Sequence, residues 1–251
     1  MPEIFAQLSP ALSAVRDSIV TCELCPRLRV YCQEIARKRR RAYQEQQYWG
    51  LPVPGFGDHI ARVLILGLAP GAHGANRTGR PFTGDGSGDF LFPILFDTGF
   101  ASQPQSSSRE DGLRLLGAWI GSVVRCAPPD DKPTPQEIRN CAVHLDEELA
   151  ALTEIRVIVC LGRVAWEGYL SYLLRTGRIS RKRDFAFGHG ATYEAGDRWL
   201  VGSYHPSLRN TNTGVLNASM LRAVFLRARL LAESVPQSGL NGPTKAKDDE
   251  S

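Results

Sequence analysis

The chain has 251 residues, of which 43% are hydrophobic, and it carries a formal net charge of +4. This length and composition support one sizeable hydrophobic core. No segment approaches the roughly 20 consecutive apolar residues of a membrane-spanning helix, and the first residues lack the pattern of a secretory signal. These features argue against an integral membrane protein, and we expect a cytoplasmic protein without a membrane partner.

Helical and strand patterns alternate along the chain. Helical patterns are expected over residues 1–20, 33–47, 88–97, 134–152, 163–174 and 216–233. Apolar runs typical of buried strands cover residues 62–67, 119–124, 156–162 and 199–203, and we expect an edge hairpin around 185–194. This alternation predicts a three-layer α/β/α sandwich with a central, mostly parallel four-stranded sheet. We expect residues 1–233 to form a single domain and residues 234–251 to form a disordered tail.

A glycine-rich segment, residues 67–85, directly follows the first predicted strand. Its glycines allow the backbone to turn sharply and to approach a ligand closely. Aromatic, acidic, imidazole and guanidinium side chains are interleaved with them. Open α/β sheets bind ligands at the carboxyl ends of their strands, where the segment His205-Pro206-Ser207 after the fourth strand also lies. The two segments therefore predict one binding cleft.

Four of the six cysteines fall into two pairs that the fold could bring together: Cys22, Cys25, Cys126 and Cys141. In a reducing compartment, such cysteines are metal ligands or buried thiols rather than disulfides. The four thiolates could hold either zinc or a [4Fe–4S] cluster, in both cases as a closed structural site. Cys32 is not needed for this set of four ligands. Cys160 lies inside an apolar strand, where a free cysteine packs as a small apolar residue.

Three motifs with these cysteines resemble those of the iron–sulfur uracil-DNA glycosylases, specifically family 5. They are residues 67–85, then Arg125-Cys126-Ala127-Pro128-Pro129 with Lys132-Pro133-Thr134-Pro135, and His205-Pro206-Ser207 with Asn210-Thr211-Asn212-Thr213-Gly214. The resemblance covers nearly the whole domain. It implies the uracil-DNA glycosylase fold, and a [4Fe–4S] cluster rather than zinc on the four cysteines.

Two positions separate this chain from the related family 4. Leu68 stands where family 4 carries an acidic residue, and Ser122 stands where family 4 keeps an asparagine that hydrogen-bonds uracil. The resemblance therefore implies an enzyme that hydrolyses the N-glycosidic bond of uracil and other deaminated bases in DNA, such as hypoxanthine and xanthine, to begin base excision repair. A strict uracil glycosylase like those of family 4 is the alternative.

This chemistry assigns roles to side chains of the predicted cleft. The target base must leave the helical stack, and we expect Phe82 to stack on it. We expect His205 to donate a hydrogen bond to the departing base, and Asp85 to stabilise the cationic sugar or to orient water. Asp85 could also cap the helix that follows it. Further substrate contacts are expected from Gly67, Leu68, Ala69, Gly71, His73, Asn76 and Ser122.

Basic residues indicate a nucleic-acid partner. The clusters at 37–41 and 178–183 are typical of surfaces that contact phosphates, and equally of solvated helix faces. We expect a nucleoid-associated monomer that contacts damaged double- or single-stranded DNA through Arg80, Arg209, Asn210 and Asn212. The competing classes are a non-catalytic nucleic-acid-binding iron–sulfur module and an iron–sulfur redox protein.

Overall fold

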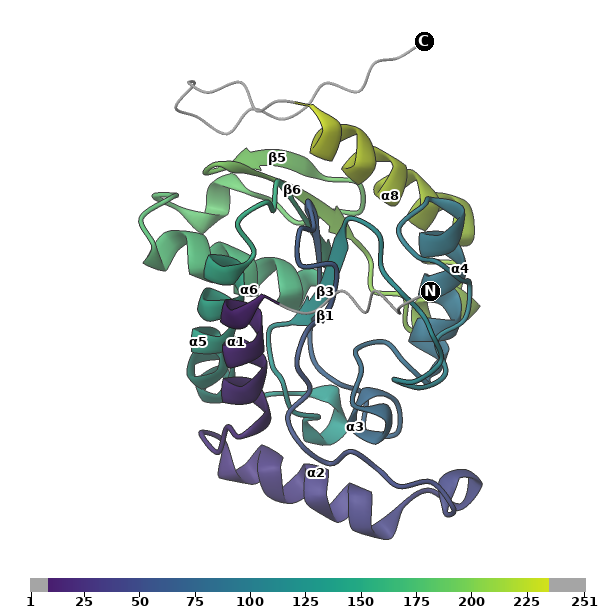
Figure 1. The fold of residues 1–251 in the computed structure, drawn as a ribbon. Coiled ribbons are helices and arrows are strands. Elements are labelled where there is room, and N and C mark those ends of the chain that lie inside the picture. The colour runs from purple at the N-terminus through teal and green to yellow at the C-terminus, as the bar shows by residue number, and fades with distance from the viewer. Residues whose placement is uncertain (1–8, 235–251) are drawn as a thin grey trace.

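The computed structural model describes residues 9–234 of the chain. Its helices are α1 (Pro10–Val20), α2 (Pro26–Lys38), α3 (Ala75–Thr78), α4 (Gly86–Asp97), α5 (Pro135–Ala151), α6 (Arg163–Arg175), α7 (Leu208–Asn212) and α8 (Ala218–Glu233). Short 3-10 turns lie at Arg41–Tyr43, Pro129–Asp131 and Lys182–Asp184. Its strands are β1 (Phe56–Gly57), β2 (Val63–Gly67), β3 (Ala118–Ser122), β4 (Val157–Leu161), β5 (Thr192–Ala195) and β6 (Arg198–Ser203). Figure 1 shows their arrangement.

The strands form a single sheet with the order β1-β3-β2-β4-β6-β5. The four inner strands are parallel, as predicted, while β1 and β5 pair antiparallel at the two edges. The predicted count of four strands is therefore wrong, because the sheet has six. Strand β1 has only two residues and leaves no periodic signal, and the hairpin lies later than expected, with its turn between β5 and β6 at Gly196.

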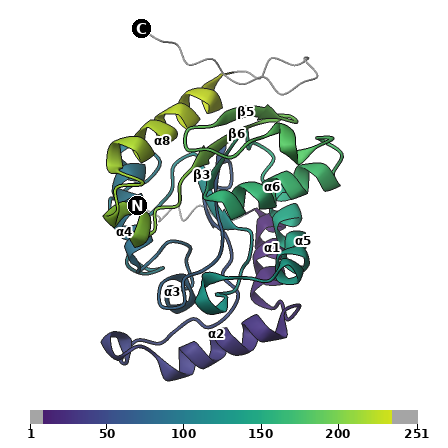
Figure 2. The same ribbon diagram turned by 180° about the vertical axis from the view of Figure 1, so that it is seen from behind.

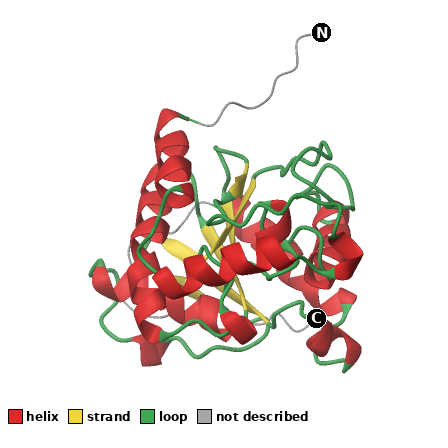
Figure 3. Cartoon of the chain, turned by 90° about the horizontal axis from the view of Figure 1, so that it is seen from below, coloured by secondary structure: helices red, strands yellow, loops and turns green. Residues whose placement is uncertain are grey.

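Helices cover both faces of the sheet, as the predicted sandwich requires (Figures 2 and 3). Strands β2 and β4 are buried along their whole lengths, as expected for strands covered on both sides. On one face α4 and α8 pack together, and α8 also contacts β2, β4 and β6. On the other face α5 and α6 pack together, with α6 against β4 and α1 against α5.

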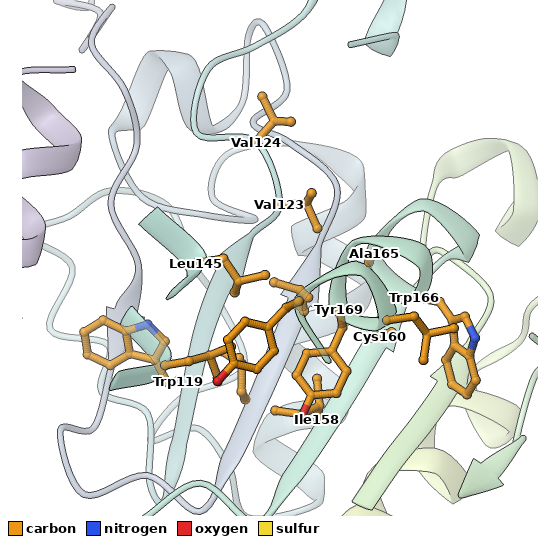
Figure 4. Close-up of a cluster of buried hydrophobic side chains, with 14 of the residues drawn as sticks. Trp119, Val123, Val124, Leu145, Ile158, Cys160, Ala165, Trp166 and Tyr169 are labelled. Carbon is orange, nitrogen blue, oxygen red and sulfur yellow. The ribbon is translucent and has the colours of Figure 1, made fainter. Parts of the chain in front are cut away.

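Cys160 belongs to the hydrophobic core beneath α5 and α6. Figure 4 shows its side chain among those of Ile158, Ala165 and Trp166. It is fully buried in β4, and burial raises the pKa of its thiol. The prediction that Cys160 only packs in the core is therefore confirmed.

The helices near the N-terminus differ most from prediction. Residues 33–47 were expected to be helical, but α2 begins at Pro26 and ends at Lys38, because Arg39 takes a left-handed φ of 50°. The predicted helix at residues 1–20 is seen from Pro10, and its first eight residues lie outside the described part. Of the predicted tail at 234–251, only Ser234 is described. No helix within residues 9–234 is long and apolar enough to cross a membrane.

Candidate functional site

A cleft of about 680 Å³ opens at the carboxyl ends of β2, β3 and β6. The glycine-rich loop after β2, the end of β3 and the loop after β6 all contribute to its wall, which confirms the predicted convergence of these segments. Of the residues expected at the site, the following line the cleft: Leu68, Ala69, Gly71, His73, Phe82, Asp85, Ser122, His205 and Arg209.

The two carboxylate oxygens of Asp85 have different surroundings. Its Oδ1 accepts hydrogen bonds from the backbone N–H groups of Ser87 (3.0 Å) and Gly88 (3.1 Å), and so caps α4. Its Oδ2 faces the turn that contains Gly71 and Gly74. An added Cβ would lie 3.1 Å from this oxygen at Gly71 and only 1.9 Å from it at Gly74. Capping therefore leaves one oxygen of Asp85 for chemistry in the cleft.

Burial changes the acidity of Asp85. It raises the pKa of the carboxyl above its ordinary value, while the two capping N–H groups oppose that shift. The ordinary value lies near 3.8, and the opposing hydrogen bonds favour the ionised form. Asp85 thus brings a partly desolvated carboxylate into a cleft whose lining, among the described residues, contains one other acidic side chain, that of Asp131.

Phe82 is held in the cleft by an unusual backbone conformation. Its φ is +50°, in the left-handed region that side chains other than glycine seldom adopt. Its ring lies against Gly67, where an added Cβ would be 2.9 Å from Cζ of Phe82. Gly67 therefore does not line the cleft but makes room for the aromatic ring. The ring centroids of Phe82 and His205 are 6.0 Å apart, and their planes are tilted by 32°.

His205 lies two residues after the end of β6 and lines the same cleft as Phe82. The side-chain amide of Asn210 donates to its backbone carbonyl oxygen (2.9 Å), which ties α7 to this residue. Burial lowers the pKa of His205 to about 4, so the imidazole is neutral at physiological pH. A neutral imidazole can still donate one N–H hydrogen bond. Asn210 thus contacts His205 itself, whereas Asn212 is exposed outside the cleft.

Asn76 and Arg80 do not occupy the positions that the sequence suggested. Asn76 is completely buried, and its amide donates to the carbonyl oxygens of Cys32 and Ala72 (3.4 and 3.3 Å), so it is not in the cleft wall. Arg80 is 2% exposed and makes a two-pronged ion pair with Asp111 (2.9 and 2.6 Å). This guanidinium holds the pKa of Asp111 at about 2 although burial opposes it. The substrate contact of Asn76 and the DNA contact of Arg80 are therefore corrected to structural roles.

Residues that sequence patterns did not place in the site also line the cleft. Arg40 and Tyr43, from the segment after α2, form part of its wall, as does Asp131. Arg40 belongs to the basic run at 37–41, but nothing in that run singled it out. Tyr48 lies behind the wall, and its hydroxyl is 3.0 Å from Nδ1 of His73. No local pattern connects these residues, because the fold alone brings them together.

The four paired cysteines line one small cavity between α2, the segment after β3 and α5: Cys22, Cys25, Cys126 and Cys141. No three His, Cys, Asp or Glu side chains in residues 9–234 stand in metal-binding geometry. The donor set nevertheless fits a metal group, because four thiols and no carboxylate line one cavity in the described part of the chain. His144 lines the same cavity, and its Nε2 is buried without a partner. Cys32, outside this set of four, lies close to Cys126, and its thiol donates to Ala127 (3.6 Å).

Comparisons with known proteins agree with this geometry. Residues 54–229 match the family model described as the uracil DNA glycosylase superfamily. A Type-5 uracil-DNA glycosylase of Thermus thermophilus is 49% identical over 86% of this chain and 96% of its own length. One of Pyrobaculum aerophilum is 45% identical over 84% of this chain and 89% of its own. A Type-4 uracil-DNA glycosylase of Archaeoglobus fulgidus is 33% identical over 62% of this chain and 70% of its own.

Proposed function

The chain belongs to the uracil-DNA glycosylase superfamily, and from this premise we propose that it hydrolyses the N-glycosidic bond of uracil in DNA and so begins base excision repair. One observation carries the proposal: a stacking ring, a partly desolvated carboxylate and a neutral imidazole line the same cleft. These are Phe82, Asp85 and His205. They match the three demands of the reaction, which are to hold the extruded base, to stabilise the sugar cation and to stabilise the departing base.

Base extrusion is the first demand. Removing a nucleotide from the stack costs a few kcal/mol, and a base–aromatic stack recovers about 1–3 kcal/mol. Phe82 offers its ring to the cleft because Gly67 leaves room behind it. Pro81 restricts the backbone just before Phe82, and Gly84 takes a φ of 77° that other residues seldom adopt. We propose that the extruded base stacks on Phe82.

Scission of the C–N bond then places positive charge on the sugar and negative charge on the base. The free Oδ2 of Asp85 is suited to the positive end, either by stabilising the sugar cation or by orienting the water that attacks it. His205 is suited to the negative end, because its neutral imidazole donates a hydrogen bond without bringing a full charge into the cleft. The two residues thereby divide the work across the breaking bond.

The base range follows from which side chains the pocket presents. Leu68 brings no polar group to the cleft, and Ser122 offers a short hydroxyl where a side-chain amide would read uracil more strictly. We propose that the enzyme also accepts other deaminated bases, such as hypoxanthine and xanthine. The Type-5 relatives match far more of this chain than the Type-4 relative does, which supports the resemblance to family 5 rather than family 4.

We propose that the four cysteines at the cavity hold a [4Fe–4S] cluster: Cys22, Cys25, Cys126 and Cys141. Burial raises the pKa of the thiols of Cys22, Cys25 and Cys141. The hydrogen bond with Cys32, together with burial, raises that of Cys126, so deprotonation of the set needs the compensation that a bound metal supplies. The cluster would supply structural cross-linking and not chemistry at the base, since all four ligands are protein thiolates. It would join the segment before α2 to α5 and to the loop after β3.

DNA would approach along the carboxyl edge of the sheet. Arg40 and Arg209 are exposed at the wall of the cleft, where phosphates on either side of the extruded nucleotide would pass. Each is free of an acidic partner among the described residues. We propose that the enzyme acts on DNA as a monomer, in the cytoplasm at the nucleoid.

The test is incision of a labelled duplex that carries one uracil, followed by alkali treatment. The wild-type protein should produce alkali-sensitive sites, and the Asp85→Asn variant should cleave ~100-fold more slowly. Asparagine retains an oxygen that can cap α4, so this variant should melt at the wild-type temperature. Duplexes with hypoxanthine or xanthine measure the base range. Binding to DNA without incision would leave the chain a non-catalytic binding module and would refute the proposal.

A further inference from the structure

A buried tyrosine supports His73 from behind the cleft wall. The hydroxyl of Tyr48 is 3.0 Å from Nδ1 of His73, and it accepts a hydrogen bond from the backbone N–H of Arg40 (3.3 Å). The Tyr48 side chain belongs to a residue only 6% exposed, and its ring meets the imidazole edge to face with centroids 6.0 Å apart. The chemistry described above gives Tyr48 no role.

The hydrogen bonds of this pair determine which nitrogen of His73 carries the proton. A phenol hydroxyl has a single hydrogen to donate. The Arg40 N–H already uses the oxygen as an acceptor, and Nδ1 of His73 is the one acceptor within reach of the hydroxyl among the described residues. A buried hydroxyl without an acceptor is costly. Tyr48 therefore donates to Nδ1, and a neutral His73 carries its proton on Nε2.

The surroundings of His73 keep the ring neutral. Burial lowers its pKa, and the nearby guanidiniums of Arg40 and Arg77 lower it further. Arg77 is fixed in place because its Nε donates to the backbone carbonyl of His73 (2.7 Å). With Nδ1 occupied, Nε2 is the ring nitrogen left for a ligand, and no described residue accepts a hydrogen bond from it.

We propose that Tyr48 is a positioning residue that fixes His73 as a hydrogen-bond donor, through Nε2–H, to a carbonyl oxygen of the extruded base. This inference rests on the proposed function and names how its site selects substrates. Deamination replaces an amino group of a base by a carbonyl group. A fixed N–H donor can form a hydrogen bond with the carbonyl oxygen. It cannot form one with an amino group, because that group is itself a donor. A donor aimed at the carbon that loses its amino group thus favours uracil over cytosine and hypoxanthine over adenine.

The test uses Tyr48→Phe, which removes the hydroxyl and keeps the ring. In protein labelled with ¹⁵N on its histidine rings, long-range ¹H–¹⁵N spectra report the tautomer, and His73→Phe identifies the His73 signals. Wild-type His73 should be the Nε2–H form, and Tyr48→Phe should give a mixture. Single-turnover cleavage of uracil and of hypoxanthine should both slow by roughly 10-fold, the scale of one neutral hydrogen bond. The ratio of the cleavage rates of uracil and cytosine should fall by the same factor.

Tyr193→Phe is the matched control, because Tyr193 is a buried tyrosine in β5 whose hydroxyl donates to the Ala186 carbonyl (3.3 Å) outside the cleft. It should leave the tautomer and the base preference unchanged. If Tyr48→Phe does not fold, His73→Phe should still show the equal loss on both bases.

Two results would overturn the inference. One is a wild-type His73 with its proton on Nδ1. The other is full retention of rate and base preference in Tyr48→Phe or in His73→Phe. A wild-type protein that releases no base at all would instead refute the proposed function, and the tautomer of His73 would still test its hydrogen bond with Tyr48.

Discussion

At the scale of single residues, the side chains that matter in the cleft combine a structural role with a proposed chemical role. Asp85 caps α4 with one oxygen and keeps the other for the cleft. His205 is anchored through its backbone by Asn210 and remains neutral through burial. Sequence patterns identified both residues because they lie in glycine- and proline-rich loops after strands. The same patterns could not show that the guanidinium of Arg80 is paired with the carboxylate of Asp111, which lies 31 positions away in the sequence.

Gly74→Ala tests whether the placement of Asp85 matters for catalysis. The added Cβ would lie 1.9 Å from Oδ2, so the carboxylate must move. A displacement of this size can cost ~100-fold in rate, and we expect that loss in single-turnover cleavage. Gly188→Ala is the control, because its Cβ would meet Ala191 at an ordinary 3.7 Å. Equal rates for the two variants would show that Asp85 is only a helix cap.

The depressed pKa of His205 predicts a contribution to acid sensitivity. The folded value is about 4, whereas the unfolded value is near 6.5, so the unfolded chain binds the extra proton between these pH values. The free energy of unfolding should therefore fall as pH drops from 6.5 toward 4, by about 2 kcal/mol at pH 5 from this residue. Urea unfolding of His205→Asn at pH 7 and pH 5 should show a smaller loss than wild type. An equal loss of unfolding free energy in the variant and the wild type would show that His205 is solvated and has an ordinary pKa.

At the scale of elements, the inner strands were predictable and the edges were not. Continuous runs such as Val63–Gly67 and Val157–Leu161 are typical of buried parallel strands, and the structure confirms both. Strand β1 has two residues and owes its pairing to β3 alone. The helix α2 starts at Pro26, earlier than helical periodicity suggested, with a proline at its first position, which favours a helix start, and with Cys25 of the cysteine cavity at its N-cap.

The cysteine cavity joins these N-terminal elements to α5, so its integrity should be visible in colour and in stability. Cys126→Ala should abolish the visible iron–sulfur absorbance and lower the melting temperature, since a ligand is removed. Cys160→Ala removes the same atoms from strand β4, outside the lining of the cysteine cavity, and should keep the chromophore. Metal analysis of anaerobically purified protein checks the assignment. Stoichiometric zinc without iron would contradict it.

At the scale of the whole molecule, the fold gathers distant segments at one edge of the sheet. Residues near 40, 70, 85, 122 and 205 share one cleft, which explains why no single stretch of sequence reveals the complete site. The predicted α/β/α layers account for this convergence, because parallel strands end together. Contacts behind the wall, such as Tyr48 with His73, depend on loop paths that periodicity does not encode.

The distribution of basic residues predicts which ones DNA contacts. Arg40→Gln with Arg41→Gln removes two exposed charges beside the cleft. The salt dependence of DNA affinity should then become shallower, by up to about 0.9 for each phosphate that the variant no longer neutralises. Arg175→Gln with Arg178→Gln makes the same change in charge where α6 ends, at the opposite edge of the sheet. Equal salt slopes for the two double variants would show that Arg40 and Arg41 are solvated side chains that do not contact DNA phosphates.

The most direct test of the account is the fate of the bond between sugar and base. No lysine lines the cleft in the described residues, so hydrolysis by water is expected rather than attack by an amine. A duplex with one uracil, incubated with the protein in H₂¹⁸O and borohydride, should release free uracil and leave ¹⁸O on the abasic sugar. No protein should become linked to DNA. Intact uracil in the duplex, or a trapped covalent protein–DNA adduct, would contradict the account.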